Sequence, residues 1–189
     1  MEALLISTGV VALAEIGDKT QLLSLVLAAR FRRPLPIIGA ILVATLLNHA
    51  LAGVLGVWIT TMLGPTKMRW VLGASFLAMA VWTLIPDKVE SDQPSRPSRY
   101  GVFGTSLVSF FLLEMGDKTQ IATVALAARF PSLVAVVAGT TLGMMIANVP
   151  VVVIGDKAAA RLPLRLIRGV AAALFALLGA LALGGVGAS

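Results

Sequence analysis

Long apolar segments separated by short polar stretches run along the whole chain. They cover about residues 3–29, 35–63, 69–86, 101–129, 133–154 and 165–187. Each is near or above the roughly 20 residues that a helix needs to cross a bilayer, and the third is the shortest. The pattern therefore predicts an all-α integral membrane protein with six transmembrane helices.

A polar string interrupts two of these apolar segments. Residues 15–21 read E-I-G-D-K-T-Q, and residues 114–120 read E-M-G-D-K-T-Q. A single Asp or Lys at the centre of a spanning helix costs roughly 2.5–3.5 kcal/mol on insertion scales. Ionisable residues inside a membrane are typical of functional sites. A cluster that occurs twice therefore indicates an ion-transport site.

The repetition extends beyond this motif. The sequence L-A-A-R-F occupies residues 27–31 and recurs at residues 126–130. We therefore expect two three-helix repeats, at residues 1–86 and 100–189, joined by a polar cytoplasmic linker at residues 87–99. Because three is odd, the two repeats would cross the membrane in opposite directions. Inverted repeats of this kind occur in many secondary transporters that work by alternating access.

Composition and charge agree with a membrane protein. Hydrophobic residues make up 58% of the 189 residues and charged residues only 13%, which favours the lipid bilayer as the main partner. The net charge is +6, but the basic residues are dispersed in loops and form no aromatic-interleaved patch, which argues against nucleic-acid binding. Most of them follow the first, third and fifth predicted spans. The positive-inside rule then places both termini outside the cytoplasm.

The acids and amides of the two motifs are the candidate metal ligands. These residues are Glu15, Asp18, Gln21, Glu114, Asp117 and Gln120. On a continuous helix Glu15 and Asp18 share a face, because they are three positions apart, so four carboxylates could converge. An all-oxygen site suits magnesium, calcium or manganese. The chain has no Cys and one His, which argues against zinc, copper and iron–sulfur sites.

The other motif residues are expected to support the site. They are Gly17, Lys19, Thr20, Gly116, Lys118 and Thr119. Each lysine follows its glutamate by four positions, the favourable order for an intrahelical ion pair. Each glycine either loosens the helix, exposing backbone carbonyls, or allows close helix packing. Each threonine is expected to bond back to a carbonyl four residues earlier.

Three polar residues outside the motifs have weaker signals. Asn48 and Asn148 are equivalent by repeat, and they either line the pathway or form interhelical hydrogen bonds. His49 has no counterpart, because position 149 is Val. We therefore expect His49 to be a polar packing residue.

Two copies of E-x-G-D-K/R-S/T, each in the first helix of a three-helix unit, resemble a family of manganese/calcium transporters. That family includes bacterial manganese exporters and Golgi cation/proton antiporters. The resemblance covers the whole chain and implies that the four motif acids form the cation path. It also implies Mn²⁺ export, with Ca²⁺ as the rival substrate and no prosthetic group. Organellar members carry an N-terminal targeting extension that is missing here, so we expect a bacterial plasma (inner) membrane protein.

Proton exchange follows from the chemistry of the cluster. Four close acids without a cation cannot all remain ionised in a low-dielectric site, so protonation would replace the departing metal. A Ca²⁺/H⁺ antiporter and a passive divalent cation channel are the alternatives. Intramembrane aspartyl proteases share a G-x-G-D string, but here glutamate replaces the first glycine, so no enzyme activity is expected. The small-residue runs near the C-terminus favour packing within the protomer, and a homo-oligomer stays open.

Overall fold

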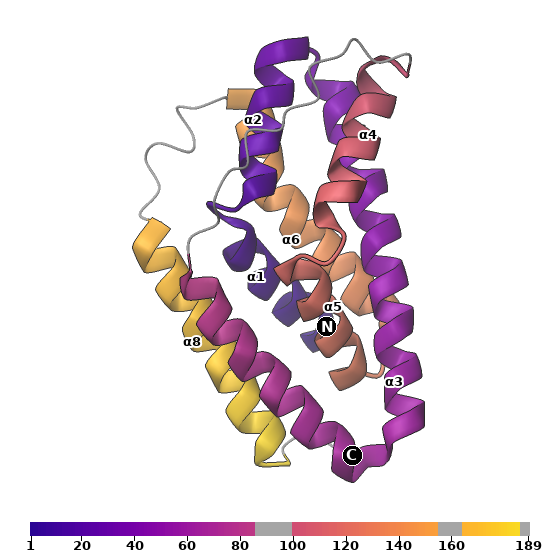
Figure 1. Cartoon of the computed structure of the whole chain (residues 1–189), viewed down its shortest axis with the longest axis vertical. Coiled ribbons are helices and arrows are strands. Elements are labelled where there is room, and N and C mark those ends of the chain that lie inside the picture. The colour runs from indigo at the N-terminus through magenta and orange to yellow at the C-terminus, as the bar shows by residue number, and fades with distance from the viewer. Residues whose placement is uncertain (86–99, 155–163, 186–189) are drawn as a thin grey trace.

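The structure is a computed structural model that describes residues 1–85, 100–154 and 164–185. All regular secondary structure in these residues is helical, as the apolar pattern predicts (Figure 1). The helices are α1 (Glu2–Glu15), α2 (Lys19–Phe31), α3 (Pro34–Leu84), α4 (Gly101–Glu114), α5 (Lys118–Arg129), α6 (Leu133–Ile154) and α8 (Leu164–Leu183). The predicted linker at residues 87–99 lies outside the described residues.

The helix breaks at both polar motifs. Gly17 has φ +82° and Gly116 has φ +77°, a left-handed conformation that glycine adopts without the steric cost of a Cβ. The preceding residues, Ile16 and Met115, are extended, with ψ of 118° and 119°. Of the two roles expected for these glycines, the structure bears out the interrupted helix, and the helical spacing assumed between the motif residues does not hold. Because the two breaks share almost the same dihedral angles, they are a property of the repeated sequence.

The second and third apolar segments form one long element. In α3 the only non-helical residue is Gly64, with φ 69° and ψ 167°. Gly64 precedes a proline, which disfavours the helical conformation in the residue before it. This kink separates the predicted spans 35–63 and 69–86. The last two predicted spans correspond closely to α6 and α8.

Three helices of the described residues are long and apolar enough to cross a membrane. They are Pro34–Gly64, Leu133–Ile154 and Leu164–Leu183. The breaks leave α1, α2, α4 and α5 with 14, 13, 14 and 12 residues, each shorter than a bilayer requires for one helix. The described part of the chain is thus all-helical and contains helices that can span a membrane, and the six-span inverted repeat stays a prediction.

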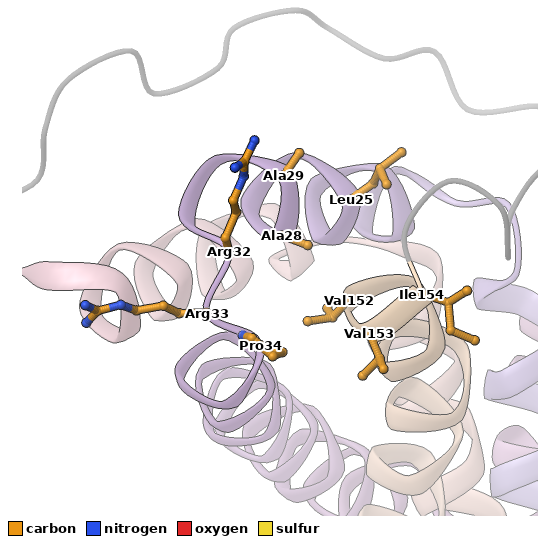
Figure 2. Close-up of a pocket in the computed structure, with 9 residues that line it drawn as sticks. All are labelled: Leu25, Ala28, Ala29, Arg32, Arg33, Pro34, Val152, Val153 and Ile154. Carbon is orange, nitrogen blue, oxygen red and sulfur yellow. The ribbon is translucent and has the colours of Figure 1, made fainter.

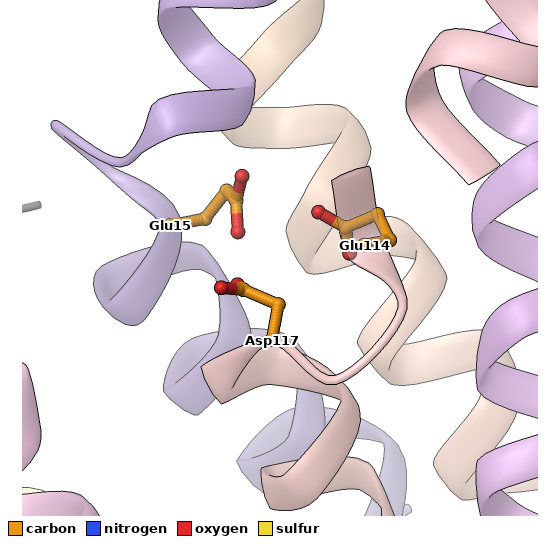
Figure 3. A group of neighbouring side chains, drawn as sticks. All are labelled: Glu15, Glu114 and Asp117. Atoms are coloured by element: carbon orange, nitrogen blue, oxygen red, sulfur yellow. The ribbon is translucent and has the colours of Figure 1, made fainter. Parts of the chain in front are cut away.

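Helices from the two halves of the sequence pack against each other. The most extensive contacts join α1 to α6, and α3 to both α5 and α8. A Cβ added at Gly143 of α6 would lie 2.6 Å from the Thr8 carbonyl oxygen of α1, so glycine permits this close approach. The motif at the α1–α2 break is thereby held beside the motif at the α4–α5 break (Figures 1 and 3).

Candidate metal centre

Carboxylates from both helix breaks meet in the interior. Glu15 ends α1, Glu114 ends α4, and Asp117 immediately precedes α5. Each offers an oxygen atom, and these three atoms lie within 4.8 Å of one another (Figure 3). The exposed fractions of these residues are 0%, 0% and 3%. Three of the four predicted acids therefore form one buried cluster, which we call the carboxylate cluster.

The fourth acid belongs to an ion pair. Asp18 is buried just before α2, and its Oδ1 lies 3.4 Å from Lys118 Nζ. The equivalent pair joins Lys19 Nζ to Asp117 Oδ1 at 2.9 Å. Each lysine thus binds the aspartate of the other motif. The predicted intrahelical pairs with glutamate are wrong, because the helix break removes the four-residue helical spacing on which they depend.

Several carboxylate oxygens of the cluster receive no hydrogen bond from the part of the chain that the structure describes. Within the described residues, neither oxygen of Glu15 and only one oxygen of Glu114 has a hydrogen-bond partner. That one, Glu114 Oε2, accepts a hydrogen bond of 3.2 Å from Thr119 Oγ1. A buried ionised carboxylate without donors is costly. The cluster is therefore suited to hold either a cation or protons.

The two glutamines stabilise the helix breaks. Gln21 Oε1 accepts a 2.9 Å hydrogen bond from the Gly17 N–H, and Gln120 Oε1 accepts a 2.7 Å hydrogen bond from the Gly116 N–H. Gln21 also donates from Nε2 to the Ala147 carbonyl oxygen at 2.9 Å. These bonds satisfy backbone donors that the break leaves without helical partners. A role of the two amides as metal ligands stays a prediction.

The threonines differ from their predicted role. Thr119 donates to the carboxylate of Glu114, five positions earlier, in place of a backbone carbonyl. Thr20 is fully buried, and its hydroxyl has no hydrogen-bond partner in the part of the chain that the structure describes. The predicted back-bonding is wrong for both residues, because each helix break lies between the threonine and the carbonyl four residues earlier.

Both repeated asparagines form interhelical hydrogen bonds. Asn48 of α3 donates from Nδ2 to the Phe111 carbonyl oxygen of α4 at 3.0 Å. Asn148 of α6 accepts a 2.7 Å hydrogen bond from Ser24 Oγ of α2 at its Oδ1. Both side chains are buried. The structure thus bears out the interhelical alternative, and a place on the ion pathway stays a prediction.

The residue next to Asn48 lies beside the carboxylate cluster. His49 Nε2 is 4.0 Å from Glu114 Oε2, and both side chains are fully buried. The sequence alone predicts only a packing role for His49, since it has no repeat counterpart. The sequence feature that could have indicated a place near the site is its position directly after the repeated Asn48.

A separate cavity lies between the C-terminal end of α2 and the end of α6. Its volume is about 580 Å³ (Figure 2). The lining residues are Leu25, Ala28, Ala29, Arg32, Arg33, Pro34, Val152, Val153 and Ile154. The two charged side chains among them, Arg32 and Arg33, are positive, so this cavity is unsuited to a divalent cation. The carboxylate cluster is the better candidate for a metal centre.

The chain matches a known family over most of its length. The family described as "Divalent cation/proton antiporter GDT1" matches residues 3–91 and 102–187. The chain belongs to the GDT1 family. The resemblance inferred from the doubled motif is therefore confirmed, and the family is one of membrane transporters.

Individual relatives agree with this family. A Vibrio cholerae protein named "Putative manganese exporter" is 55% identical over 179 residues, which cover 94% of this chain and 88% of that protein. The Arabidopsis thaliana "GDT1-like protein 3" is 28% identical, and the match covers 92% of this chain and 68% of that protein. The "GDT1-like protein 3" of Oryza sativa subsp. indica is 27% identical, and the match covers 92% of this chain and 71% of that protein. No solved structure matches the chain.

Proposed function

We propose that this GDT1 family member exports Mn²⁺ in exchange for protons through the carboxylate cluster. The observation that carries the proposal is the meeting of Glu15, Glu114 and Asp117 at two helix breaks, within 4.8 Å and away from solvent. Carboxylate oxygens are the ligands that Mn²⁺, Ca²⁺ and Mg²⁺ prefer. The 55% identical relative, named for manganese export, favours Mn²⁺.

The charges of the site support the exchange of metal for protons. The motifs contribute four carboxylates and two lysine ammonium groups, so their formal charge is −2. One divalent cation or two protons would neutralise it. Metal and protons compete for the same oxygens, and loading with one then expels the other. This mutual exclusion couples the two fluxes.

The repeated backbone supports alternating access. In this proposal the chain has six spans in two inverted three-helix repeats, with both termini outside and the linker in the cytoplasm of a bacterial cell. Two nearly identical breaks and the exchanged lysine–aspartate pairs are what such symmetry would produce. Broken helices at the bilayer midplane are the usual place of ion sites in secondary transporters.

Transport into proteoliposomes tests the proposal. Purified protein should move Mn²⁺ against its gradient when a pH gradient is imposed, and the metal flux should change the pH of the opposite compartment. Glu15→Gln and Glu114→Gln should each reduce the rate at least about tenfold, equivalent to about 1.4 kcal/mol. Glu2→Gln is the matched control, because Glu2 is an exposed residue at the other end of α1.

Two outcomes would overturn this function. If Glu15→Gln, Glu114→Gln and the Asn variants of Asp18 and Asp117 all transported at the wild-type rate, the site would be elsewhere. If Mn²⁺ flux ignored the imposed pH gradient, the protein would be a passive channel. The same assay with Ca²⁺ separates Mn²⁺/H⁺ exchange from Ca²⁺/H⁺ exchange, the alternative that the oxygen-rich cluster also fits.

A further inference from the structure

His49 is a buried imidazole to which no described residue is hydrogen-bonded. Its exposed fraction is 0%, and neither Nδ1 nor Nε2 has a hydrogen-bond partner within the described residues. Buried polar atoms are nearly always hydrogen-bonded, and leaving one without a partner costs about 1–3 kcal/mol. A packing role alone does not explain why a buried position of α3 carries two such atoms.

The position of the ring points to the carboxylate cluster. Nε2 lies 4.0 Å from Glu114 Oε2, beyond hydrogen-bonding distance. Two donor atoms that each lie about 2.2 Å from one cation are at most about 4.4 Å apart. A single ion can therefore contact Glu114 Oε2 and His49 Nε2 together, with little movement of either side chain.

The imidazole makes the site unequal in its two halves. In the second repeat, Val149 follows Asn148 where His49 follows Asn48 in the first. A nitrogen donor is thus available beside one repeat only. A site that uses carboxylate oxygens alone does not require a histidine at this position.

We propose that His49 is a nitrogen ligand of the transported ion and sets the preference for Mn²⁺ over Ca²⁺. The inference rests on the proposed function, because it assigns a ligand within that site. Ca²⁺ binds oxygen ligands, whereas transition metals also bind imidazole nitrogen. A nitrogen ligand therefore strengthens Mn²⁺ binding and adds little for Ca²⁺.

Pulsed electron paramagnetic resonance of bound Mn²⁺ tests the ligand directly. His49 is the single histidine of the sequence, so imidazole coupling in tag-free protein has one source. We expect nitrogen modulation of the Mn²⁺ signal that changes when histidine is labelled with ¹⁵N and disappears in His49→Gln. Bound Mn²⁺ without this modulation in the wild-type protein would overturn the proposal, and so would modulation that His49→Gln leaves in place.

Selective transport tests the consequence. His49→Val, which copies Val149, should lower the apparent Mn²⁺ affinity about tenfold and leave that for Ca²⁺ within about twofold. Thr45→Val is the control, since it removes another buried polar group of α3. An equal loss for both metals would show a structural role and overturn the proposal. Wild-type protein that moves neither metal against its gradient would instead defeat the proposed function.

Discussion

Lys118 and Asp18 form one ion pair, yet we expect their removal to cost different amounts of stability. Their side chains are 4% and 3% exposed, and removal of one partner of a buried pair costs roughly 3–5 kcal/mol because the other charge stays buried. The formal charge of the two motifs is −2 with both lysines present. Lys118→Met makes it −3, whereas Asp18→Asn reduces it to −1. Lys118→Met should therefore reach the upper end of that range and Asp18→Asn the lower end.

A double-mutant cycle measures whether the pair exists. The free energy of unfolding in mixed micelles, followed by tryptophan fluorescence, should show a coupling of roughly 1–3 kcal/mol between Lys118→Met and Asp18→Asn. Mn²⁺ should reduce the penalty of Lys118→Met, because it neutralises the excess negative charge. The control cycle combines Glu15→Gln with Lys19→Met, the pair that a continuous helix would form. Strong coupling there, with none between Asp18 and Lys118, would refute the broken helices and the exchanged pairs.

Three further outcomes are expected. Gly17→Ala and Gly116→Ala should both lower the thermal stability in detergent, because both glycines have a positive φ, which costs other residues roughly 1–2 kcal/mol. The loss should be larger for Gly17→Ala, since a Cβ there would also lie 2.8 Å from Leu164 Cδ2. Equal losses would contradict this packing. Reporter fusions should place both termini outside, and a C-terminal reporter active only in the cytoplasm would invert the topology. Mn²⁺ at 100 times its Kd should stabilise the protein by about 2.7 kcal/mol. Binding of Zn²⁺ without any binding of Mn²⁺ would contradict the proposed manganese site.

The all-helical class and the family could be predicted from the sequence, because both depend on local signals. The length and position of the apolar runs indicate which segments form apolar helices. They predicted the all-helical class and the ends of α6 to within a residue. The doubled motif gave the family. Gly17 and Gly116 also raised the possibility of a loosened helix, but the sequence alone did not separate this from close helix packing.

The partners of the charged residues cannot be predicted from the spacing of residues along the sequence. Helical periodicity paired Lys19 with Glu15, since it assumes a continuous helix between them. The break leaves the lysine facing Asp117 of the other repeat. The approach of His49 to Glu114 has the same origin, because it depends on how α3 packs against α4. Such contacts between distant segments are set by the tertiary structure.

The exchanged ion pairs have a consequence for half-length chains. Lys19 with Asp117 and Lys118 with Asp18 are one contact made twice in reciprocal form, as at an isologous interface between identical subunits. A polypeptide with only one repeat could complete its motif charges by pairing with a second copy of itself, and so would form an obligate dimer. Joining two copies in one gene fixes their ratio at one to one. It also frees each copy to diverge, so that one can carry a histidine where the other carries a valine.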